Sequence, residues 1–107
     1  MTQQLWTSRT GNADQGTLLV ITQHLHRLDE LAISVAALGY YTFVALPDAV
    51  AALCAVTQFD LAILMSDVAA ADRDRVAVVT ALQARLLPLD GVGEATLGEQ
   101  IRTRLGR

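Results

Sequence analysis

The sequence predicts an α/β domain built on a parallel sheet. Three short apolar runs rich in β-branched residues, at residues 17–22, 41–46 and 61–65, are typical of strands buried on both faces. Stretches with apolar residues at helical spacing separate these runs. Alternating strands and helices favour right-handed crossovers, which place successive strands parallel in one sheet. At 107 residues, the chain is long enough for one domain and too short for two.

Residues 1–16 are polar and show no periodicity. We expect them to form a flexible tail in which Trp6 is the only residue able to act as an anchor, followed by a folded domain over 17–107. After the first strand, a helix is indicated by apolar residues at helical spacing: Leu25, Leu28, Ala32, Val35 and Ala36. Gly39 ends this helix as a left-handed cap would. Pro47 opens the next helix, because proline fits a first helical turn.

The segment at residues 69–84 fits two structures. Val76, Val79 and Leu82 suit one face of a helix, whereas residues 76–81 alone could form a strand. A strand there would leave about nine residues for a parallel crossover, which takes a dozen or more, so we favour the helix. Residues 85–89 are then predicted as the fourth strand. A C-terminal helix is marked by Leu97, Ile101 and Leu105.

The composition limits the classes of function. Apolar residues make up 52% of the chain and the mean hydropathy is +0.37, which predicts a real core and a surface for a partner or for self-association. No apolar run reaches the ~20 residues of a membrane span, and we see no secretory leader. A single cysteine favours a reducing cytoplasm. The net charge of −3 gives no case for nucleic-acid binding.

In order and spacing, several segments resemble the receiver domain of two-component response regulators. Residues 38–40, the strand and helix after them, and residues 51–53 are similar to the second βα unit of that family. Residues 59–64 resemble the approach to its phosphorylation site, and residues 88–90 resemble the turn into its last helix. The resemblance implies a flavodoxin-like fold, with helices on both faces of a parallel sheet.

Receivers form an acyl phosphate on an aspartate, with Mg²⁺ held by an acidic pair and the phosphate bound by a lysine. By position, the resemblance puts the acidic pair on Thr22 and Gln23, the acceptor on Met65 and the lysine on Leu87. None of these side chains can do the family's chemistry. The chain contains no lysine at all, and its eight basic residues are Arg9, Arg27, Arg73, Arg75, Arg85, Arg102, Arg104 and Arg107. We therefore expect a pseudo-receiver that is not phosphorylated.

Asp67 is the one alternative acceptor. It lies two residues after Met65, and a shift of two residues keeps a side chain on the same face of a strand. Because the acidic pair and the lysine are missing, we prefer to interpret Asp67 as a solvated loop aspartate.

The chain is also short for this family. Between Met65 and Pro88 there is room for one helix and one strand, so we expect one βα unit to be missing and the sheet to have four strands. In the alternative, residues 76–81 are the family's fourth strand and Thr80 is a phosphate-sensing remnant. Either way, surface that the family covers is left bare, and a homodimer or a tight partner would cover it.

Other residues give little sign of chemistry. His24 and His26 lack a third ligand for a metal, so we expect no metal site and no cofactor. Cys54 has the spacing of a core position. Because no nucleophile is placed beside a base, we expect no enzymatic activity.

We thus expect a phosphorylation-independent signalling module that acts in trans on a protein partner, as a homodimer. The expected interaction surface is the last strand with the C-terminal helix, rimmed by Arg85, Arg102 and Arg104. Two alternatives stay open: a divergent receiver phosphorylated at Asp67, and a small-ligand sensor. The sensor would use the former phosphorylation pocket, lined by Thr22, Gln23, Met65 and Ser66.

Overall fold

The computed structural model describes residues 5–9, 16–80, 85–88 and 97–105 of the chain. Strands and helices alternate along it, as predicted. The elements are β1 (Trp6–Arg9), β2 (Thr17–Ile21), the 3₁₀ helix η2 (Leu25–Arg27), α1 (Leu28–Ala36), β3 (Tyr41–Ala45), α2 (Pro47–Val56), β4 (Leu61–Leu64), α3 (Ala70–Thr80), β5 (Arg85–Pro88) and α4 (Leu97–Leu105).

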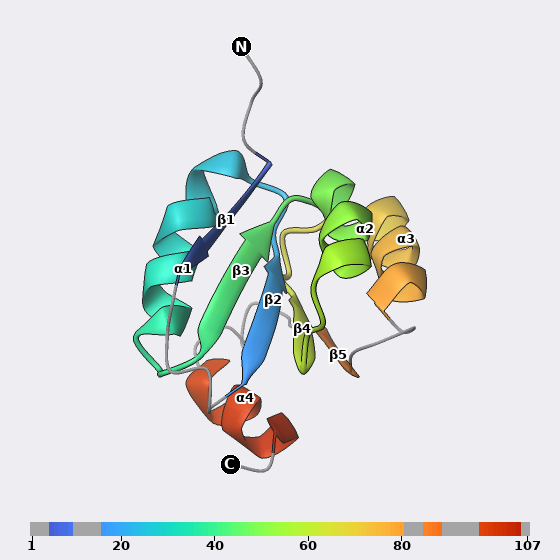
Figure 1. The fold of residues 1–107 in the computed structure, drawn as a ribbon. Coiled ribbons are helices and arrows are strands. Elements are labelled where there is room, and N and C mark those ends of the chain that lie inside the picture. Colours follow the sequence, from blue (N-terminus) through green and yellow to red (C-terminus); the bar gives the residue numbers. More distant parts are fainter. Residues whose placement is uncertain (1–4, 10–15, 81–84, 89–96, 106–107) are drawn as a thin grey trace.

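The sheet has the strand order β1-β3-β2-β4-β5 (Figure 1). Strands β3, β2, β4 and β5 are parallel, and β1 is antiparallel to β3. The four predicted parallel strands are therefore present, and β1 adds a fifth, antiparallel strand that the sequence did not predict. The expected flexible tail at residues 1–16 is wrong for Trp6–Arg9, which form β1.

β1 is an edge strand, so its sequence carries little of the pattern of a buried strand. Its register places Trp6 beside Ala45 and Thr7 beside Val44. The Leu46 N–H donates to the Leu5 carbonyl at 2.9 Å. The Trp6 ring stacks on Phe43 with the ring centroids 5.9 Å apart, which confirms Trp6 as an anchor. Backbone hydrogen bonds and one aromatic contact hold this polar segment on the sheet.

β2 and β4, the central strands, are buried on both faces, as their apolar runs predict. Leu18 and Val20 of β2 pack on one side of the sheet in a cluster with residues of α1 and α4. Leu19 and Ile21 pack on the other side with residues of α2 and α3. All four of these side chains are fully buried. The domain thus has three layers, with helices on both faces of the sheet.

The helix ends follow the signals in the sequence. Gly39 has φ 103°, the left-handed conformation predicted for the end of the first helix, and its N–H donates to the Ala36 carbonyl at 2.9 Å. Pro47 is the first residue of α2. α2 and α3 lie side by side on one face of the sheet (Figure 1).

The segment after β4 is helical. α3 runs from Ala70 to Thr80, so the alternative in which residues 76–81 form a strand is wrong. Val76 is buried against α2, as the helical spacing of the apolar residues predicts. This packing decides in favour of a helix, although the β-branched residues of the segment also fit a strand. The proposed phosphate-sensing role of Thr80 depended on that strand and has lost its basis. In the described residues, no helix is long and apolar enough to cross a membrane.

Candidate functional site

The candidate site lies where β2 and β4 end beside one another. The chain leaves β2 towards β3 on one side and leaves β4 towards β5 on the other, so the strand order reverses here. In parallel α/β sheets this carboxyl edge is where ligands bind. Thr22 directly follows β2, and Met65 directly follows β4. The Met65 N–H donates to the Ile21 carbonyl at 3.0 Å, which extends the pairing of the two strands into the site.

Asp67 is the centre of the site, and the prediction of a solvated loop aspartate is wrong because its carboxylate is bound by donors from the loop after β2. One carboxylate oxygen, Oδ2, accepts the Thr22 hydroxyl at 2.6 Å and Nη1 of Arg27 at 3.2 Å. The other oxygen, Oδ1, accepts the backbone N–H of Gln23 at 3.3 Å. The Asp67 side chain is 14% exposed, and Thr22 is fully buried. The carboxylate thus has three donors, one of which is charged.

The hydroxyl of Thr22 both donates and accepts a hydrogen bond. It donates to Asp67 and accepts the backbone N–H of His24 at 3.4 Å. The side chain of Gln23 also crosses the site, because its Oε1 accepts the backbone N–H of Ala69 at 3.2 Å. Two loops that are distant in sequence, one after β2 and one after β4, are therefore joined by side chains from each.

Arg73 of α3 holds the loop after β4 by two hydrogen bonds to its backbone. Its Nε donates to the Val68 carbonyl at 2.9 Å, and its Nη2 donates to the Met65 carbonyl at 3.1 Å. The loop that carries Asp67 is thus held at both ends. This guanidinium fixes backbone rather than presenting its charge to a ligand.

The side chain of Met65 takes no part in the polar network. It is 1% exposed and packs in the core cluster formed with α1 and α4. Two of the residues predicted at the former phosphorylation site, Thr22 and Gln23, meet Asp67, whereas Met65 is a core residue. Leu87 pairs with Ile63 in the sheet, but its side chain lies outside the described residues.

The two histidines lie at the rim of the site. Their rings are 5.4 Å apart and tilted by 34°, and both residues are exposed. Nε2 of His24 is 4.0 Å from Oδ2 of Asp67. Among the described residues, no three His, Cys, Asp or Glu side chains come together as a metal site requires.

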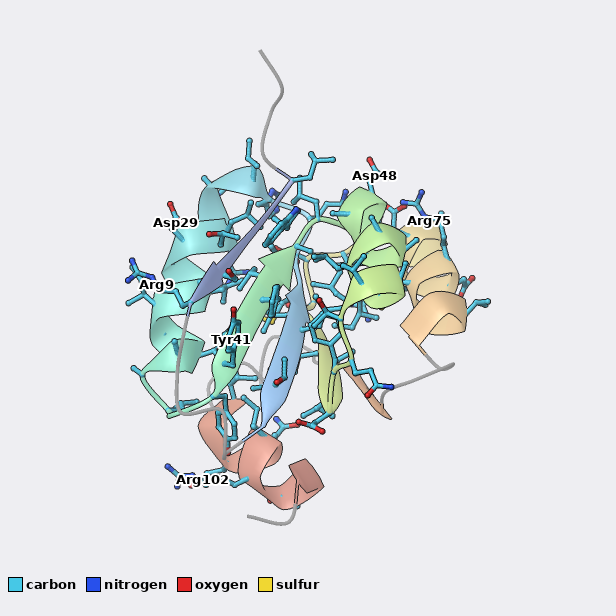
Figure 2. All side chains as sticks on the ribbon, viewed as in Figure 1. Arg9, Asp29, Tyr41, Asp48, Arg75 and Arg102 are labelled. Atoms are coloured by element: carbon cyan, nitrogen blue, oxygen red, sulfur yellow. The ribbon has the colours of Figure 1, made fainter. Side chains whose placement is uncertain are left out.

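The predicted interaction surface is only partly within the described residues. Arg102 of α4 is exposed and points away from the sheet (Figure 2). Arg85 lies in β5 beside Leu61, and Arg104 lies in α4, but the side chains of both are outside the described part. The side chain of Thr80 is outside it as well.

Arg27 and Arg73 are the site residues that sequence reasoning did not single out. Both stand in helical segments where a charged residue ordinarily faces solvent. The available signal for Arg27 was its position six residues after the end of β2, close to the carboxyl edge of the sheet. That position alone does not identify a partner 40 residues further along the chain.

Comparison of the chain with protein-family models, with curated proteins and with solved structures finds no match.

Proposed function

We propose that this chain is a receiver-like signalling domain that does not use phosphoryl transfer and that regulates a protein partner by docking. The proposal includes the flavodoxin-like relationship. Its support is the order of the four parallel strands and the helices on both faces of the sheet. The antiparallel strand β1 is a departure from that pattern.

The observation that carries the proposal is the environment of Asp67. A phosphoryl acceptor needs an accessible carboxylate oxygen and a metal ion to neutralise the incoming phosphoryl oxygens. Here Oδ2 already accepts a hydroxyl and a guanidinium N–H. The positive charge beside this oxygen comes from Arg27 of this chain. Such a carboxylate is suited to joining two loops rather than to attacking phosphorus.

The burial of two of the four residues predicted to line the ligand pocket opposes the small-ligand alternative. Thr22 is fully buried and Met65 is 1% exposed, so neither presents a surface that a ligand could touch. We therefore propose that the surface that docks the partner lies on the exterior of the domain, at α4, where Arg102 is exposed.

Phosphorylation is tested by intact mass after incubation with Mg²⁺ and acetyl phosphate. We expect no phosphoryl adduct on the wild-type chain. A receiver that keeps its acidic pair and its lysine serves as the positive control. An adduct on the wild type that is absent from Asp67→Asn would overturn the proposal and favour a divergent receiver.

A further inference from the structure

We draw no further inference here: the strongest candidate, the partly exposed aromatic patch that Trp6, Tyr41 and Phe43 form on strands β1 and β3, carries none, because nothing in the structure shows what covers it.

Discussion

At the scale of residues, the Asp67 carboxylate acts as a structural tie between the loops after β2 and β4. Each of its donors comes from the first loop or from the helical turn after it: the Thr22 hydroxyl, the Gln23 N–H and the Arg27 guanidinium. A hydroxyl as buried as that of Thr22 needs an acceptor, because an unmade hydrogen bond costs about 1–3 kcal/mol. The hydrogen bonds of Asp67 therefore contribute to the stability of the whole domain.

Asp67→Ala should lower the free energy of unfolding by about 2–3 kcal/mol, because it leaves the Thr22 hydroxyl without its acceptor and Arg27 without this carboxylate. Asp67→Asn keeps an acceptor oxygen and should cost less. Asp74→Ala is the control, because Asp74 is exposed and its loss should fall within about 0.5 kcal/mol of zero. Urea unfolding measures all three. Equal losses for Asp67→Ala and Asp74→Ala would contradict a structural role for Asp67.

The sequence could predict only part of this site. Thr22 and Gln23 were expected to share a pocket with residues 65–66, and they bind the next residue along the chain, Asp67. The pairing of Arg27 with Asp67 could not be foreseen, because it depends on the path of a 3₁₀ turn and on a loop that Arg73 holds in place. Local patterns contain no information about such contacts between distant segments.

At the scale of elements, the end of α1 depends on the backbone conformation of Gly39. Its φ of 103° lies in a region where a Cβ atom clashes with the backbone. Gly98 in α4 is the opposite case. A Cβ added there would lie 3.5 Å from the methyl groups of Leu38, an ordinary van der Waals contact.

Gly39→Ala should therefore destabilise the protein by about 1–2 kcal/mol, because alanine is strained in the left-handed conformation that glycine adopts freely. Gly98→Ala should be neutral or stabilising by up to about 1 kcal/mol, because alanine favours a helix over glycine. Thermal unfolding of the two variants beside the wild type distinguishes them. The same sign of change in both would show that the backbone conformation does not govern these positions.

The elements themselves could be predicted to different degrees. The strands of the parallel sheet were predictable because burial on both faces requires continuous apolar runs, such as that of β4, Leu61–Leu64. α3 was ambiguous, since Val76 and its β-branched neighbours fit two structures, and only the length needed for a crossover favoured the helix. β1 was missed because an edge strand can be polar, and Trp6 alone signalled its contact with the sheet.

At the scale of the whole molecule, β1 closes the β3 edge of the sheet. The hydrogen bond between Leu46 and Leu5 fixes the alternation of the ladder. Since hydrogen-bonded pairs alternate in antiparallel strands, the backbone groups of Thr7 point towards Val44, and those of Ser8 point away from β3.

Thr7→Pro should therefore lower the free energy of unfolding by about 1–3 kcal/mol, because it removes an N–H from the ladder and leaves a strand carbonyl without its donor. Ser8→Pro should cost less, because its N–H lies on the open side of the edge strand. Urea midpoints of the two variants measure the difference. A larger loss for Ser8→Pro would contradict the register of β1.

The Arg27–Asp67 pair has a further consequence for how such a domain would carry information. An acyl phosphate hydrolyses, so a phosphorylated aspartate records an event for a limited time and is then reset. A carboxylate neutralised by an arginine of the same chain has no such lifetime and no dependence on a phosphodonor. Under the proposed function, the strength of the signal would follow the number of copies in the cell. Synthesis and degradation of the protein, rather than hydrolysis of a phosphate, would then set how long the signal lasts.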